Sequence, residues 1–103
     1  MFFQIFVEQI LFLYFLLLLL QVLLKVKEKL QDVGNWTHDD IHDALINLAK
    51  DMELKNGTVM WPTRIAISGI TVTPGGAIEI LEILGKDESL ARIQVGIEKL
   101  QNV

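Results

Sequence analysis

The sequence contains no cysteine and relatively few basic residues. The absence of Cys among its 103 residues excludes disulfide bonds and metal sites with thiolate ligands, and it fits a reducing cytoplasm. Nine Lys and Arg residues stand against 13 Asp and Glu, which gives a formal net charge of −4. Non-specific nucleic-acid binding needs cations that neutralise phosphates, so this balance argues against generic nucleic-acid binding.

The chain also lacks the sequence patterns of a self-sufficient enzyme. No Gly-rich phosphate loop follows a predicted strand, and no nucleophile is paired with a base in a recognisable pattern. There is no internal repeat and no low-complexity linker. A length of 103 residues suits one small domain or a piece of a larger protein.

The N-terminal quarter is strongly apolar. Residues 1–24 include only four polar side chains, and residues 10–20 form an unbroken apolar run. A helix of about 20 such residues can span a bilayer, and the following Lys25, Lys27 and Lys29 would then favour a cytoplasmic position for the rest of the chain. Without a charged n-region or a small-residue cleavage site, the segment is a poor signal peptide.

Two other interpretations of this segment remain open. It could be a leader of unrelated origin, joined to the remains of a longer gene, or a buried helix that completes a bundle. We favour the unrelated leader and place it at residues 1–21, ahead of a helical domain at residues 22–103. An exposed apolar surface of this size is also a candidate for oligomerisation or aggregation.

Helical periodicity begins before residue 24 and continues beyond it. Residues 22–33 predict an amphipathic helix, and Gly34 predicts its end. Thr37 is expected to cap the next helix, with Asp40 at the position of the capping-box acid. The clearest apolar face of the chain follows, consisting of Ile41, Ala44, Leu45, Leu48, Ala49 and Met52.

The second half predicts further helices, although one stretch is ambiguous. Residues 59–72 contain β-branched residues typical of strands, together with Pro62 and Gly69 at positions typical of a helix start and end. Thr73 and Pro74 are expected to cap and begin a helix that ends at Gly85. The last helix starts near Lys86 and Asp87, and its expected apolar stripe is Leu90, Ile93, Ile97 and Leu100.

Several linked motifs occur in a fixed order in this half. A Gly-x-Val-Met-x-Pro-x-Arg-x-Ala run occupies residues 57–66, a Ser-Gly turn 68–69, a Thr-Pro-Gly helix start 73–75 and an Ile-Leu-Gly-Lys stop 83–86. Together they resemble the C-terminal anticodon-binding region of bacterial glutamyl-tRNA synthetases (glutamate–tRNA ligases). The resemblance runs from about residue 26 to about residue 100 and does not include the apolar leader.

This resemblance implies an all-α fold: a compact helical anticodon-binding domain preceded by a long apolar helix. It assigns a short helix to about 62–68 and implies tRNA anticodon recognition within a glutamate–tRNA ligase. The expected partner is tRNA(Glu), with tRNA(Gln) as a further candidate, and not DNA. ATP and Mg²⁺ would bind a catalytic domain whose motifs this chain does not contain, so no cofactor is expected here. The implied location is the cytoplasm.

The resemblance also implies which residues contact the anticodon. The arginine of the Pro-x-Arg motif, Arg64, would bond to or stack on a base; its alternative role is an ion pair with Glu79 or Glu82. Small residues occupy two positions that are bulkier in many relatives, so contact there would be made largely through the backbone. The full expected set is Arg64, Thr73, Pro74, Gly76 and Ala77.

Four other residues have alternative roles. Trp36 and Trp61 could stack on bases, but we expect both to pack in the core. His38 and His42 have a zinc-compatible i, i+4 spacing, but no third ligand is evident, and we predict no metal.

A helix-turn-helix at 77–100 and a membrane-anchored interaction protein remain alternative functions; the helix-turn-helix has few cations on its last helix.

Overall fold

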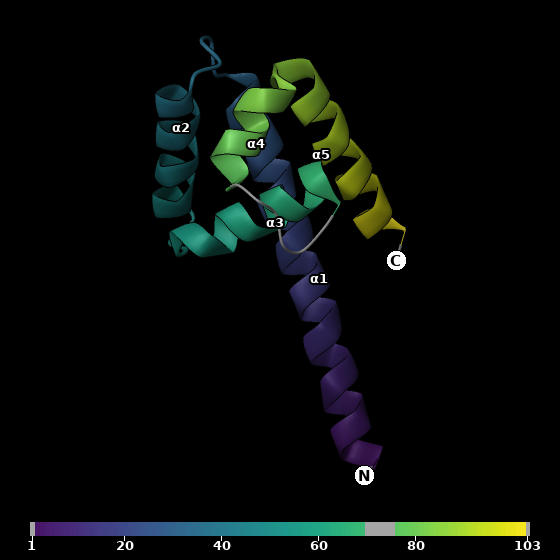
Figure 1. The fold of residues 1–103 in the computed structure, drawn as a ribbon. Coiled ribbons are helices and arrows are strands. Elements are labelled where there is room, and N and C mark those ends of the chain that lie inside the picture. Colours follow the sequence, from purple (N-terminus) through teal and green to yellow (C-terminus); the bar gives the residue numbers. More distant parts are fainter. Residues whose placement is uncertain (1, 70–75, 103) are drawn as a thin grey trace.

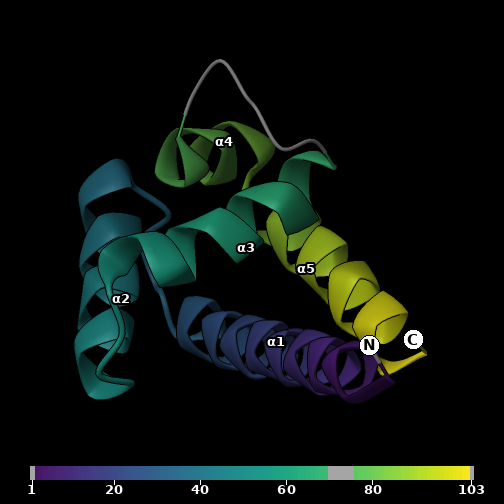
Figure 2. The same cartoon turned by 90° about the horizontal axis from the view of Figure 1, so that it is seen from below.

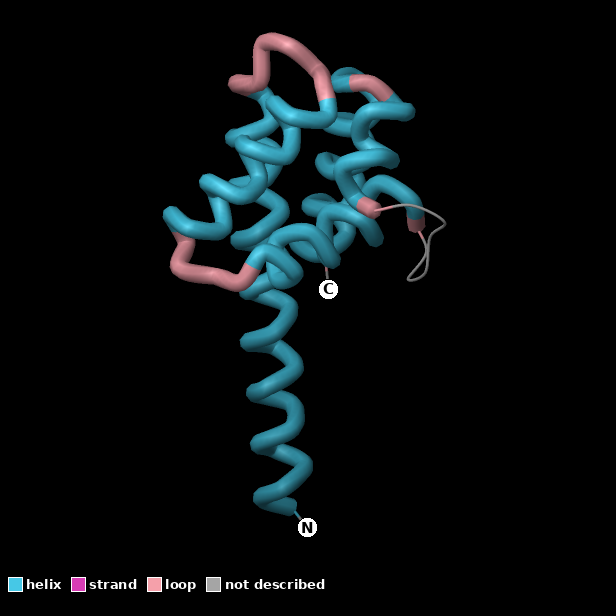
Figure 3. Tube along the Cα trace, turned by 60° about the vertical axis from the view of Figure 1, so that its left-hand side comes forward, coloured by secondary structure: helices cyan, strands magenta, loops and turns pink. Residues whose placement is uncertain are grey.

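The computed structural model describes residues 2–69 and 76–102, with side chains from Val7 onward. The described residues form five α-helices and no strand, so the predicted all-α fold is confirmed (Figures 1 and 3). The helices are α1 Phe2–Gln31, α2 His38–Asp51, α3 Asn56–Ser68, α4 Ala77–Leu84 and α5 Lys86–Gln101.

Helix α1 is one continuous element with two different environments. Its C-terminal half packs into the domain, where Val22, Val26 and Leu30 are fully buried at the four-residue spacing of one helical stripe. Its N-terminal half extends away from the other helices (Figure 1), and residues 10–15 are all exposed. The predicted long apolar helix is therefore confirmed. By length and composition alone, Val7–Gln31 could cross a membrane.

The N-terminus of α2 is capped as predicted. Thr37 has extended backbone geometry, and its side chain accepts a hydrogen bond of 3.3 Å from the Asp40 N–H. The apolar face is also confirmed, since Ile41, Leu45, Leu48 and Ala49 are buried, with Ala44 and Met52 partly buried. Just before this helix, Trp36 packs against the core as expected and donates from its indole nitrogen to the Leu81 carbonyl at 2.7 Å.

The start of α3 differs from the prediction. The helix begins at Asn56 rather than near residue 62, and Pro62 lies inside it. Burial explains the earlier start, because Val59 is fully enclosed by the core and belongs to the same stripe as Thr63 and Ile67. The Thr63 hydroxyl donates to the Val59 carbonyl at 2.9 Å. The predicted end is confirmed: Gly69 closes the helix with φ 76°.

Helix α4, unlike α3, begins later than predicted. Its first residue is Ala77 and its N-cap is Gly76, whereas the sequence predicted a cap at Thr73 and a first helical residue at Pro74. Thr73 and Pro74 themselves lie outside the described residues. A single residue, Gly85, joins α4 to α5.

The predicted apolar stripes of the last two helices are largely confirmed. Ile78 and Leu81 of α4 are buried, as are Ile93 and Ile97 of α5. Three residues at the ends of these stripes are only partly buried against the core, namely Leu84, Leu90 and Leu100.

Helix α3 lies at the centre of the domain. It contacts all four of the other described helices, and Figure 2 shows it passing between α2 and α5, with α1 on one side and α4 on the other. Its flanks therefore face different neighbours, and one flank forms a groove with α4.

Candidate functional site

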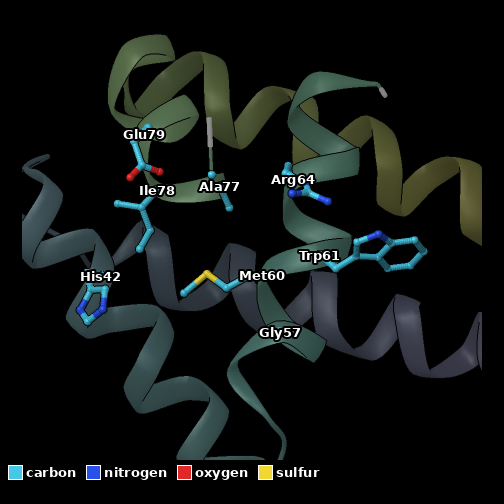
Figure 4. Close-up of a pocket in the computed structure, with 9 residues that line it drawn as sticks. His42, Gly57, Met60, Trp61, Arg64, Ala77, Ile78 and Glu79 are labelled. Carbon is cyan, nitrogen blue, oxygen red and sulfur yellow. The ribbon is translucent and has the colours of Figure 1, made fainter. Parts of the chain in front are cut away.

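An open groove of about 490 Å³ lies between α3, the N-terminus of α4 and one residue of α2. Three of the five predicted site residues line it: Arg64 from α3, Gly76 as the cap of α4, and Ala77 as the first residue of α4 (Figure 4). The structure thus brings together residues that are 12 positions apart in the sequence. The other two, Thr73 and Pro74, lie outside the described residues.

One face of α3 forms a wall of the groove. Gly57, Met60, Trp61 and Arg64 line it, at spacings of three, four and seven residues that place them on one side of a helix. The Arg64 side chain is half-buried, so its stem is covered by neighbouring atoms. The opposite face carries the buried stripe that fixes α3 in the core, and Arg64 is therefore held by a well-packed helix.

The position of Trp61 corrects the sequence-based expectation. We expected it in the core, but it is 39% exposed and lines the groove. Helical geometry explains this, because Trp61 lies two residues, about 200° of rotation, from the buried Val59. Its ring also neighbours that of Phe15 of α1, with centroids 6.5 Å apart.

The N-terminus of α4 forms the opposite wall. Gly76 has an extended backbone with φ −79° and ψ 174°, and the Ile80 N–H donates to its carbonyl at 3.2 Å. Ala77 and Ile78 are buried, so this helix end is anchored. The first N–H groups of a helix and its dipole make this a partially positive position.

Two acidic residues of α4 are near the first residue of α2. Glu79 lies with one carboxylate oxygen 3.6 Å from His38 Nε2, and Glu82 accepts a 3.0 Å hydrogen bond from the His38 backbone N–H. Both residues had been candidates for an ion pair with Arg64. In the structure, His38 contacts both carboxylates.

The two histidines of α2 are arranged without a sign of metal ligation. Their rings lie nearly parallel with centroids 6.3 Å apart. His38 has Asp39 and Glu79 each at 3.6 Å, and His42 has Asp43 at 3.5 Å. Among the described side chains there is no group of three or more potential metal ligands.

Sequence reasoning missed several residues of the groove, namely Gly57, Met60, His42 and Ile78. A signal for the first two was present, because Gly57 and Met60 precede Arg64 by seven and four residues. These spacings place Gly57 and Met60 on the same helical face as Arg64 only because α3 starts at Asn56, upstream of the predicted start near residue 62. Neither His42 nor Ile78 had a comparable signal, since their position depends on how α2 and α4 pack.

Comparison with known proteins assigns this fold to a family. Residues 18–97 match the family model described as "Anticodon binding domain". The glutamate–tRNA ligase of Clostridium tetani is 52% identical over 83 residues, which is 81% of this chain and 17% of the relative. That of Clostridium novyi is 51% identical over 77 residues, 75% of this chain and 16% of the relative.

The similarity therefore covers most of this chain but only about a sixth of each relative. It begins at residue 18 in the family match, close to where α1 starts to pack against the core with Leu18. Since the match covers more than three quarters of its residues, this chain belongs to the anticodon-binding domain family, in the form found in glutamate–tRNA ligases.

Proposed function

We propose that this chain binds the anticodon loop of tRNA(Glu) as the anticodon-recognition part of a glutamate–tRNA ligase. The observation that carries the proposal is the groove in which Arg64 meets the N-terminus of α4. The cavity is open and bounded by one cationic side chain, one indole ring and the start of a helix. Unpaired bases are recognised by such combinations of stacking surfaces and hydrogen-bond donors.

The low number of cations is compatible with this proposal. Recognition of splayed bases needs a local set of donors, whereas non-specific phosphate binding needs a broad basic surface. A net charge of −4 therefore argues that other parts of a ligase hold the remainder of the tRNA. Arg64 supplies five N–H donors in a planar group suited to a base edge or face.

The residues on the α4 side complete the proposed site. Thr73 and Pro74 are included from the resemblance alone. At Gly76 and Ala77, contacts would be made through the backbone, because Gly76 has no side chain and Ala77 is buried. Ligase activity, with its ATP and Mg²⁺, would belong to a catalytic domain outside this sequence, and the cytoplasm is the proposed location.

The alternative of a DNA-reading helix-turn-helix is disfavoured by the contacts of α5. Its Arg92 donates to the Glu88 carboxylate at 2.8 Å and to the Ile67 carbonyl at 2.6 Å. That arginine therefore ties α5 to its own turn and to the end of α3. A recognition helix instead presents its basic side chains to the groove of the duplex.

The proposal is tested by binding of the full chain, kept in solution with a mild non-ionic detergent, to stem–loop RNAs. One stem–loop carries the UUC anticodon that pairs with the glutamate codon GAA, and another has the same stem with a scrambled loop. We expect a preference for UUC in the wild-type chain, and a loss of about tenfold in UUC affinity for Arg64→Ala. Lys50→Ala is the control, since Lys50 is an exposed cation of α2 that does not line the groove.

Two results would contradict the proposal. One is equal wild-type affinity for the UUC loop and the scrambled loop. The other is an equal loss of affinity in the Arg64→Ala and Lys50→Ala variants, which would mean that Arg64 acts only as a general positive charge.

Exchange of this segment into the Clostridium tetani ligase, followed by measurement of aminoacylation with anticodon variants of tRNA(Glu), tests the same role in an intact enzyme.

A further inference from the structure

The part of α1 that extends away from the domain is apolar on every side (Figure 1). Residues 10–17, which we call the rod, all carry apolar or aromatic side chains. Those of residues 10–15 are between 44% and 70% exposed. Successive residues of an α-helix are rotated by about 100°, so six consecutive positions point in all directions around the axis. The rod therefore has no polar side to turn towards water.

This pattern distinguishes among the neighbours that could cover the rod. A partner helix or a protein groove covers one side of a helix, and such helices carry an apolar stripe with polar residues opposite. A second copy of this chain would bring one more rod, and the outer sides of the pair would still be exposed. A helix that is apolar all round matches surroundings that enclose it completely, as the hydrocarbon of a bilayer does.

The length of the rod fits the hydrocarbon of one leaflet. Residues 10–17 rise about 12 Å at 1.5 Å per residue, and one leaflet supplies about 15 Å, which is half of the roughly 30 Å of a bilayer. The rod lies inside the continuous helix α1, where each N–H bonds to the carbonyl four residues earlier. It can therefore enter hydrocarbon with its backbone donors satisfied.

The side of the domain from which the rod extends carries residues typical of a membrane interface. The exposed ring of Trp61 lies 6.5 Å from that of Phe15, and both residues line a recess of about 260 Å³ between α1 and α3. Tryptophan is enriched at the boundary between hydrocarbon and water because its indole is amphipathic. Helix α5 ends on the same side (Figure 1), and Lys99 is exposed in its last turn, where a long cationic side chain can reach headgroups.

Electrostatic attraction does not provide the affinity for such a surface. The formal net charge is −4, and Glu8 is an exposed carboxylate two residues ahead of the rod, where hydrocarbon makes a charge costly. Proteins that adsorb to anionic lipids instead carry clusters of basic residues. Binding must therefore come from burial of the apolar side chains of the rod, and it should not depend on anionic lipid.

We propose that the rod inserts into the hydrocarbon of a lipid bilayer, with Trp61 at the level of the headgroups and the helical domain outside in water. The inference goes beyond the proposed function and is independent of it, because neither the surface nor its lipid partner involves RNA. Without lipid or detergent, the same apolar surface has only other copies of the chain to contact.

The first measurement is flotation of the full chain with phosphatidylcholine vesicles after the detergent has been removed. We expect the wild-type chain to float with the vesicles, and added phosphatidylglycerol should not increase the bound fraction. Leu13→Lys combined with Leu17→Lys should lower that fraction by about tenfold or more, because each lysine is costly in hydrocarbon. Ile83→Lys is the matched control: it adds a lysine at an exposed apolar residue of α4, and it should float as the wild type does. Circular dichroism checks that both variants are folded.

A second measurement identifies what surrounds the rod. Because the chain contains no cysteine, a single cysteine introduced at each of residues 10–15 in turn, such as Leu13→Cys, carries the only nitroxide label. In the vesicles we expect every one of these labels to collide more often with dioxygen, which concentrates in hydrocarbon, than with a water-soluble nickel complex. Ile83→Cys is the matched control, and its label should collide more often with the nickel complex.

Three results would overturn the insertion of the rod. The first is a wild-type chain that stays at the bottom of the gradient, and the second is binding that requires phosphatidylglycerol and disappears in high salt, since this is adsorption by charge. The third is a set of labels shielded from both reagents along one side of the helix, which means that a second copy or another protein covers it. Hydrocarbon contact at every labelled position, together with loss of flotation in the double lysine variant, supports insertion.

Discussion

At the scale of single residues, one carbonyl group joins three parts of the fold. The Leu81 oxygen accepts from the Trp36 indole at 2.7 Å, from the Gly85 N–H at 3.1 Å and from the buried Ser89 hydroxyl at 3.3 Å. These donors come from the segment before α2, the α4–α5 junction and α5. Trp36 therefore contributes a specific polar contact as well as apolar packing.

We expect Trp36→Phe to lower the free energy of unfolding by at least about 1 kcal/mol, because the hydrogen bond is lost and a smaller aromatic ring replaces the indole. Urea unfolding followed by circular dichroism measures this change. The same substitution at the exposed Trp61 is the control and should change stability by less than about 0.5 kcal/mol. An equal effect at both positions would show that the Trp36 bond contributes nothing of its own.

Two glycines are expected to respond in opposite ways to the same substitution. Gly85 has φ 83° and ψ 166°, a region almost restricted to glycine, so Gly85→Ala should destabilise the domain by about 1–3 kcal/mol. Gly57 lies in the first turn of α3, and an added Cβ there meets no atom within 4 Å. Gly57→Ala should stabilise it by about 0.5 kcal/mol. Thermal unfolding of both variants checks the signs.

At the scale of helices, the first residue of α5 holds the end of α1. The Lys86 ammonium donates to the Gln31 carbonyl at 2.9 Å and to the Val33 carbonyl at 2.8 Å. The last carbonyls of a helix lack partners within the helix and carry partial negative charge. One cation thus closes α1 and fixes the position of α5 against it.

Lys86→Met keeps most of the apolar stem and removes the charge. We expect a loss of about 1–2 kcal/mol in the free energy of unfolding, since charged hydrogen bonds contribute more than neutral ones. Lys25→Met is the control: Lys25 pairs with Glu28 at 3.7 Å on the surface, where such pairs contribute about 0–1 kcal/mol. A Lys86 variant as stable as the Lys25 variant would contradict this role.

At the scale of the whole molecule, the C-terminal part of α1 packs in the domain, whereas residues 10–15 and Leu17 of the same helix are exposed. Residues 2–17 rise about 24 Å at 1.5 Å per residue, less than the roughly 30 Å of hydrocarbon in a bilayer. From Leu18 onward the helix packs against the core. The described part of α1 ahead of Leu18 is therefore shorter than that hydrocarbon layer.

We expect the full chain to associate in the absence of detergent, because the exposed side chains of residues 10–15 and Leu17 are all apolar. Sedimentation velocity measures the association. Leu13→Lys combined with Leu17→Lys should give a monomer, since both residues are more than half exposed. Ile83→Lys is the control, an isolated exposed apolar residue of α4, and should associate as the wild type does. A wild-type monomer without detergent would contradict the prediction.

The sequence alone predicted the helices whose signals are local. The Thr37 cap, the apolar face of α2, the Gly69 end of α3 and the Lys86 start of α5 depend on neighbouring residues along one helix. The linked motifs of residues 57–86 predicted the family, which the comparisons confirm. Those motifs also predicted Arg64, Gly76 and Ala77 as site residues, and the structure places these three around one groove.

Tertiary structure decided what depends on contacts between helices. Burial of Val59 extended α3 upstream past Pro62, and the rotation of that helix turned Trp61 outward into the groove. The packing of α4 against α3 and α2 placed Glu79 in the same groove as Arg64. A local sequence pattern fixes which face of a helix is apolar, but the core around it selects where the helix begins and which polar side chains meet.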